Sequence, residues 1–237
     1  EWGQNWPGAK YTLSAYLYSN NLFETPLQDP SDEEPAEDNL GPCEGEFTVN
    51  YQGYDYELVE IGDQCWFAEN CRYLPSVDSY QNAQTEEPQA FVQAFHGSDI
   101  SLAIQSPFYE AFGAYYNLAA VNTWALCPSG FDVASANDWA SLVSFTTFTT
   151  LNGLECNSGK LLQRHQGDLL GFDLRQSGKA SGENVFNEAN YWPSNALIVI
   201  DEGQYFQQIE ILESGYIFVS IETAEAGLSV RCIKDAE

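Results

Sequence analysis

Two cysteine-containing segments decide how this chain folds: Cys127-Pro128-Ser129-Gly130-Phe131 near the middle and Ser229-Val230-Arg231-Cys232 near the end. The chain has six cysteines, with no Cys-x-x-Cys pair and no histidine beside them, which favours disulfides over metal binding or redox chemistry. We therefore expect a disulfide between Cys127 and Cys232 that joins two ends of one domain. It would close a loop of about 105 residues and stabilise the fold by roughly 4 to 5 kcal/mol through the entropy of loop closure.

The cysteine pattern also predicts where the protein is located. Disulfides persist in oxidising compartments, so we expect an extracellular or cell-surface protein. The chain begins at Glu1 and contains no methionine, as expected of a mature chain after removal of a secretory signal peptide. Its longest apolar runs, such as residues 196–200, are strand-sized and far shorter than the roughly 20 residues of a membrane helix, so we expect no membrane span.

The chain is strongly acidic, with a net charge of -27 from 35 acidic and 8 basic residues. Phosphate backbones and anionic lipids would be repelled, which argues against a nucleic-acid partner. The charge is typical of a solvated exterior surface. Binding of Ca²⁺ by clustered carboxylates is the alternative, although no Asp-x-Asp-x-Asp-Gly loop is present. We therefore expect no cofactor, with Ca²⁺ as the candidate if there is one.

Composition divides the chain into three parts. Residues 1–27 form an apolar arm in which residues 11–17 alternate with the period of a half-buried strand. One side of that segment carries Tyr11, Leu13, Ala15 and Leu17. Residues 28–42 are an acidic, proline-containing linker, and residues 43–237 are one domain. The arm either packs on its own domain or adds as a strand to a neighbouring molecule.

The domain itself reads as short strands with few helices. Residues 47–61 predict a hairpin that turns near Gln52-Gly53. A short helix is expected within residues 89–105, and a longer one after Val133, where Ser135 and Asp138 resemble a capping box. Turn residues separate four apolar segments, which predict an antiparallel meander. These segments are residues 196–200, 205–212, 216–221 and 228–233.

Five segments follow one another in an order that matches a known family. They are residues 61–75 (Ile61-Gly62-Asp63-Gln64-Cys65-Trp66-Phe67-Ala68-Glu69-Asn70-Cys71-Arg72-Tyr73-Leu74-Pro75), 112–117 (Phe112-Gly113-Ala114-Tyr115-Tyr116-Asn117), 126–133 with the later Trp139, 158–161 and 228–235. Together they resemble the Fibrobacter succinogenes major paralogous domain over roughly residues 47 to 235.

The resemblance implies a fold but no general biochemical activity. Family members are secreted or surface-attached bacterial proteins, and the domain resembles C-type-lectin-like and formylglycine-generating-enzyme-like folds. We therefore expect a disulfide-stapled, mixed α+β domain whose ends are joined. Cys71 stands where the family usually has leucine, and Cys43 and Cys156 lie outside its motifs, so two further bridges are expected. The pairing among Cys43, Cys65, Cys71 and Cys156 stays open.

Patterns typical of catalysis are missing from the sequence. It has no Gly-x-Ser-x-Gly elbow and no His-Glu-x-x-His helix, and its two histidines are His96 and His165. We therefore expect a protein that is not an enzyme. An enzyme on a similar fold, with one of these histidines as a general base, is the lesser alternative.

Candidate binding residues lie in the loop-rich region of residues 152–195 and in the hairpins that follow. They combine flat aromatic faces with amide groups, which suits a glycan or a protein surface: Asn190, Tyr191, Trp192, Asn195 and Tyr205. The competing interpretation of Trp192 and Tyr205 is a position in the core. We expect a non-catalytic recognition or adhesion domain that binds a glycan or surface protein. The alternative is a structural subunit of a surface appendage or envelope complex that assembles through residues 1–27.

Overall fold

The computed structural model describes residues 40–148, 162, 170–180, 188–200 and 203–234 of the 237-residue chain. The chain divides into two units, Glu1–Asn39 and Leu40–Glu237, of which the second is described below. The predicted arm, residues 1–27, and most of the predicted linker, residues 28–42, lie outside the described residues.

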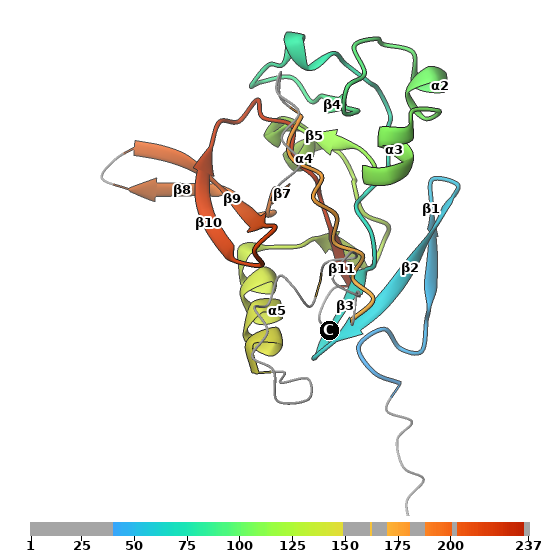
Figure 1. Cartoon of the computed structure of the whole chain (residues 1–237), viewed down its shortest axis with the longest axis vertical. Coiled ribbons are helices and arrows are strands. Elements are labelled where there is room, and N and C mark those ends of the chain that lie inside the picture. Colours follow the sequence, from blue (N-terminus) through green and yellow to red (C-terminus); the bar gives the residue numbers. More distant parts are fainter. Residues whose placement is uncertain (1–39, 149–161, 163–169, 181–187, 201–202, 235–237) are drawn as a thin grey trace, which may run out of the picture. The chain divides into compact units, whose positions relative to one another are not determined.

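The first sheet joins the start of the described unit to its end. It is antiparallel and curls into a half-barrel, with the strand order β1-β2-β3-β11-β6. Its strands are β1 (Thr48–Tyr51), β2 (Tyr54–Ile61), β3 (Gln64–Phe67), β11 (Cys232–Lys234) and β6 (Phe131–Val133). Figure 1 shows the red β11 beside the cyan β3, so strands from the two ends of the unit are neighbours.

The second sheet is built around β9 (Gly203–Leu212). β10 (Ile217–Glu222) pairs with one edge of β9, while β7 (Glu188–Tyr191) and β8 (Leu197–Ile200) pair with the other edge, all antiparallel. The strands predicted near residues 196–200, 205–212 and 216–221 are therefore confirmed. A small third sheet pairs β4 (Ala90–Phe91) with β5 (Tyr115–Tyr116).

The predicted meander is wrong in its last member. Of residues 228–233, only the end belongs to a named strand, β11, which pairs with β3 and β6 instead of β10. Leu228 and Ser229 form single bridges to Tyr116 and Tyr191. The segment crosses to the first sheet because its side chains are buried there and Cys232 is bonded to Cys127.

The described helices are short, apart from α5. They are the 3-10 helix η1 (Tyr80–Asn82), α2 (Ile100–Ala103), α3 (Pro107–Phe112), α4 (Leu118–Thr123) and α5 (Ala136–Phe148). Side chains of Asp99, Ser106 and Asn117 cap the N-termini of α2, α3 and α4, as is usual for these residue types. None of the described helices is both long and apolar enough to cross a bilayer.

The capping box predicted for α5 is confirmed. The Ser135 N–H donates to Asp138 Oδ2 at 2.7 Å, and the Asp138 N–H donates to Ser135 Oγ at 3.3 Å. One face of the helix then buries Trp139 and Leu142. The Trp139 ring lies 5.2 Å from the ring of Trp66 on β3, so α5 packs against the first sheet.

A buried arginine connects two of the segments that matched the family. Arg231 is 1% exposed, and its guanidinium donates to Asn70 Oδ1 at 2.9 Å. It also donates to the carbonyl oxygens of Phe67, Phe172 and Asp173. The guanidinium carbon lies 4.3 Å from the centre of the Phe172 ring. These acceptors replace the water that a buried charge loses.

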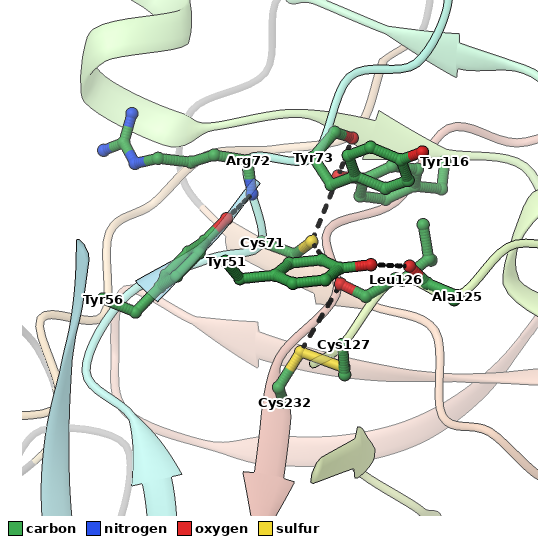
Figure 2. The surroundings of a disulfide bond; sticks show 10 residues. All are labelled: Tyr51, Tyr56, Cys71, Arg72, Tyr73, Tyr116, Ala125, Leu126, Cys127 and Cys232. Atoms are coloured by element: carbon green, nitrogen blue, oxygen red, sulfur yellow. Dashed lines mark hydrogen bonds between the residues drawn. A yellow bond between two sulfur atoms is a disulfide. The ribbon is translucent and has the colours of Figure 1, made fainter. Parts of the chain in front are cut away.

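Two disulfides are present among the described residues, and of the two additional bridges expected, one is found and the other is wrong for Cys71. Cys127 and Cys232 are bonded, as expected, and Cys43 is bonded to Cys65. Cys71 is a free, fully buried thiol. Its Sγ donates to the Leu126 carbonyl at 3.2 Å, in the core beside the Cys127–Cys232 bridge (Figure 2). Cys156 lies outside the described residues.

Candidate functional site

Three of the five predicted binding residues are core residues. Asn190, Tyr191 and Trp192 are each 0% exposed. The Trp192 indole N–H donates to the carbonyls of Tyr116 and Ala226, at 2.9 and 3.2 Å, which satisfies its polar group without solvent. Because these side chains are fully buried, they are not accessible to a ligand, and the core interpretation of Trp192 is favoured.

The other two predicted binding residues are exposed, but they do not lie in a described hollow. Asn195 Oδ1 accepts from the Ala136 N–H at 2.8 Å, so this side chain satisfies the start of α5. Tyr205 is 40% exposed on the β8–β9 hairpin. Much of the predicted binding region, residues 152–195, lies outside the described residues. A binding role for Asn195 and Tyr205 stays a prediction.

A hollow that the sequence analysis did not single out lies between the β1–β2 turn and the short helices. We call it the tyrosine groove, and its volume is about 400 Å³. Its aromatic lining consists of Tyr51, Tyr54, Tyr56, Tyr73 and Tyr109. Arg72 lies among these rings, and Ile100 and Ile104 add an exposed apolar side.

The β1–β2 turn holds two of the rings in place. Tyr51 and Tyr54 are directly paired across the hairpin, so their side chains project from the same face. Gln52 and Gly53 have φ angles of 52° and 81°, the left-handed values that a tight two-residue turn requires. The Tyr51 hydroxyl donates to the Ala125 carbonyl, as Figure 2 shows. Both ends of this ring are thereby fixed.

Arg72 is held rigidly at the centre of the groove. Its Nε donates to Glu69 Oε2 at 2.7 Å, and its other nitrogens donate to the carbonyls of Tyr109 and Glu110 at 2.8 and 2.9 Å. These carbonyls belong to α3, where a positive charge also complements the end of the helix. The guanidinium carbon lies 4.8 Å from the Tyr54 ring centre and 5.8 Å from that of Tyr109.

The groove keeps its tyrosines neutral and its arginine charged. Burial raises the pKa of Tyr109 to about 12, and burial also raises the pKa of Tyr54, with Arg72 opposing and Glu69 adding to the increase. Burial opposes the charge of Arg72, but the hydrogen bond and negative charge of Glu69 outweigh it, so the pKa of Arg72 is raised. At neutral pH the groove therefore offers phenolic hydroxyls beside a permanent cation.

A second hollow of about 440 Å³ adjoins the tyrosine groove and shares Tyr54 and Arg72 with it. We call it the charged hollow. Arg175 donates to Asp173 Oδ2 at 2.8 Å and to the Ala111 carbonyl of α3 at 2.8 Å. The charged hollow also contains Glu57 and Glu69. Together the two hollows present tyrosine rings beside positively charged arginine side chains and negatively charged carboxylates.

The histidines and the side chains that could bind a metal ion are not gathered into a site in the described part of the chain. His96 is exposed in the loop after β4, and His165 lies outside the described residues. Among the residues that can be described, no group of three or more His, Cys, Asp or Glu side chains is placed to hold a metal ion. Binding of Ca²⁺ stays a prediction.

One local sequence pattern indicates the tyrosine groove. Three tyrosines fall within six residues at positions 51, 54 and 56, next to a predicted two-residue turn. Alternation along β2 predicts that Tyr54 and Tyr56 share one face. The contribution of Tyr109 and Ile104 depends on long-range packing and leaves no local pattern.

The comparisons with known proteins find one matching family. The family model described as Fibrobacter succinogenes major domain matches residues 59–234 of the chain. Arg72, Tyr109 and Arg175 lie within the matched region, whereas Tyr51 and Tyr54 precede it. No curated protein and no solved structure matches the chain.

Proposed function

The chain belongs to the Fibrobacter succinogenes major domain family, and from the geometry of the tyrosine groove we propose that it is a non-catalytic recognition domain that binds neutral glycans there. Its two disulfides indicate an oxidising, non-cytoplasmic compartment. In such a compartment, cell-surface and extracellular glycans are accessible ligands. The recognition role is consistent with an extracellular or cell-surface location.

A relationship to C-type-lectin-like and formylglycine-generating-enzyme-like folds is part of the proposal. It is supported by the closure of the unit on itself, since β3 and β11 are neighbours in the first sheet. The Cys127–Cys232 bridge ties the same region together. Fold alone does not define function, so the argument for binding has to come from the groove.

The observation that carries the proposal is a concave surface of tyrosine rings around an immobile guanidinium. A volume of about 400 Å³ is within the range of small-molecule sites and accommodates one or a few sugar rings. The apolar faces of sugar rings can pack on Tyr54 and Ile104. The hydroxyl protons of Tyr51 and Tyr54 are donated to the Ala125 carbonyl and to Glu69, so their oxygens can accept from sugar hydroxyl groups. Sugar hydroxyl groups can also pair with the charged groups of the adjoining hollow.

Charge favours a neutral glycan over an acidic one. The whole chain carries a net charge of -27, so an anionic ligand would meet a repulsive field. Within the groove, the positive charge of Arg72 is paired with Glu69 at 2.7 Å. The local balance is therefore close to neutral.

The contacts of Glu69 also support a binding role over a catalytic one. Its carboxylate accepts from Arg72 Nε at 2.7 Å and from the Tyr54 hydroxyl at 2.9 and 3.0 Å. A carboxylate that accepts from these two side chains has a structural role, whereas a general base or nucleophile needs access to the reacting atom. Catalysis by His96 or His165 is not part of the proposal.

Glycan binding can be tested with the full chain on an array of neutral and acidic glycans, followed by titration calorimetry on the best neutral ligand. The Tyr54→Ala variant should lose at least about tenfold in affinity, because a central aromatic contact is removed. Tyr216→Ala is the matched control, since Tyr216 is 57% exposed in the turn between β9 and β10, away from the tyrosine groove. The absence of any neutral ligand for the wild type, or an unchanged affinity of Tyr54→Ala, would contradict the proposal.

A further inference from the structure

The outer edge of β10 is open in the described part of the chain. Within those residues β10 pairs with β9 alone, whereas β9 has strands on both of its edges. An open edge presents backbone donors and acceptors to any extended segment that can align with it. This edge belongs to the second sheet and includes none of the residues that line the tyrosine groove.

The hydrogen-bond pattern shows which residues of β10 face outward. The Leu212 N–H donates to the Tyr216 carbonyl at 2.9 Å, which makes these two residues a hydrogen-bonded pair. Bonded and non-bonded pairs alternate along an antiparallel ladder. The backbone groups of Ile217, Val219 and Ile221 are therefore directed away from β9, towards the open edge.

The side chains along this edge are apolar and exposed. Phe218 is 46% exposed, Val219 60% and Ile221 57%. No lysine or proline interrupts β10, although these are the residues that usually protect an edge strand. An uncharged run from Ile217 to Ile221, in which Phe218, Val219 and Ile221 are exposed, suits a strand that accepts another strand.

We propose that β10 accepts residues 11–17 of a second copy of this chain as an added antiparallel or parallel strand. Residues 11–17 contain no proline, alternate apolar with polar side chains and match the length of β10 closely. Leu13 and Leu17 would lie on the face of Val219 and Ile221. The two runs of exposed apolar side chains would then cover each other.

The position of the attachment point favours a second copy over the same chain. The described unit starts at Leu40, which leads into β1, and Figure 1 shows β1 and β10 on opposite sides of the unit. In the sequence, the 22 residues 18–39 separate the proposed strand from Leu40. A unit of about 200 residues has a radius of gyration of about 16 Å, so it is about 40 Å across. Pairing with β10 of the same chain would require residues 18–39 to cross this distance from Leu40, whereas pairing with a second copy has no such requirement.

Every copy would carry one donor arm and one acceptor edge, so the contact is head-to-tail and propagates from copy to copy. Such assembly would make the chain a subunit of a larger surface structure. It requires no disulfide exchange and no ligand. It is independent of glycan binding, and the two proposals can fail separately.

Two single variants of the full chain separate the donor from the acceptor. Val219→Pro removes an N–H that faces the open edge and leaves the hydrogen bonds to β9 in place, so β10 should still fold. Leu13→Pro disrupts the arm. Analytical ultracentrifugation over a concentration series should show oligomers for the wild type and at least a tenfold weaker association for each variant. Leu102→Lys, at a 58% exposed position on α2, is the control that should assemble like the wild type.

Mixing the two variants provides the decisive measurement. The Leu13→Pro copy keeps its acceptor edge and the Val219→Pro copy keeps its arm, so an equimolar mixture should form dimers and stop there. Val219→Lys serves as a second acceptor variant if Val219→Pro does not fold by circular dichroism. A monomeric wild type, assembly of Leu13→Pro alone, or a mixture that stays monomeric would each overturn the proposal.

Discussion

The first and second sheets differ in how many neighbours their last strands have. In the first sheet, β11 lies between β3 and β6, and Cys232 ties it to Cys127. In the second sheet, β10 has β9 on one side and an open edge on the other within the described residues. The last strand of the first sheet is held by neighbours on both sides, by a disulfide and by burial, which together close the unit on itself. The last strand of the second sheet exposes Val219 and Ile221. The comparison separates a region that stabilises the fold from one that is suited to contact with other molecules.

The largest effect is expected on removing the closure of the first sheet. Replacing Cys127 and Cys232 together by serine should lower the free energy of unfolding by about 4 to 5 kcal/mol, because the bridge joins residues 105 apart in sequence. The matched control replaces Cys43 and Cys65, whose separation of 22 residues corresponds to about 3 kcal/mol. Urea unfolding measures both. A cost below about 1 kcal/mol for the first pair would contradict the role assigned to the closure.

The next largest effect is expected at Arg231. The Arg231→Leu variant leaves Asn70 Oδ1 and three carbonyl oxygens without this donor inside the core, which should cost about 3 kcal/mol. Arg175→Leu is the control, because the Arg175 side chain is 27% exposed, and its loss should cost about 1 kcal/mol or less. Equal losses in the free energy of unfolding for the two variants would contradict a larger contribution from the buried Arg231.

Alkaline pH should lower the free energy of unfolding, because several tyrosines near the first sheet are buried. Burial raises the pKa of Tyr109 to about 12 and also raises the pKa of Tyr56 and Tyr116. A phenol with a higher pKa in the folded state stabilises the fold below the unfolded value near 10, and this contribution is lost as the pH rises from about 10 towards 12. Urea unfolding at pH 8, 10 and 11 should show this decrease. Constant stability across that range would contradict it.

The smallest effect is expected at the open edge. Val219→Thr keeps the branched side chain and changes only a residue that is 60% exposed, so it should alter the free energy of unfolding by less than about 0.5 kcal/mol. Ile211→Ala is the comparison within the same sheet, since Ile211 is fully buried and its truncation should cost about 2 to 5 kcal/mol. Measurements should be made at concentrations where both variants are monomeric. Similar costs at the two positions would remove the distinction between core and edge.

Local and covalent features were predictable from the sequence. The Gln52-Gly53 turn and the Ser135–Asp138 box each depend on a few adjacent residues, and the Cys127–Cys232 bridge followed from the cysteine pattern. The mixed α+β class with antiparallel sheets is likewise confirmed. The turn and the capping box are determined by residues that are close in sequence. The bridge is restricted to the few cysteines that the chain contains.

Features that depend on distant packing were not predictable in this way. Asn190, Tyr191 and Trp192 have side chains typical of binding surfaces, but residue type does not show whether a side chain is covered by Tyr116 or Ala226. The crossing of β11 to the first sheet depends on partners more than 90 residues away in sequence. The tyrosine groove likewise brings Tyr109 to the β1–β2 turn from another part of the chain.

The free thiol of Cys71 has a consequence for how the protein matures. Burial raises the pKa of this thiol, and its Sγ lies 3.2 Å from both the Leu126 carbonyl and the Tyr116 hydroxyl. Once enclosed, it is protected from oxidants, because the reactive thiolate is disfavoured and access is blocked. An unfolded chain has no such protection, and Cys65 is only six positions away. Collapse around Cys71 before bond formation would keep this thiol out of the bridges, so we expect the order of collapse and oxidation to influence the yield of correctly bonded protein.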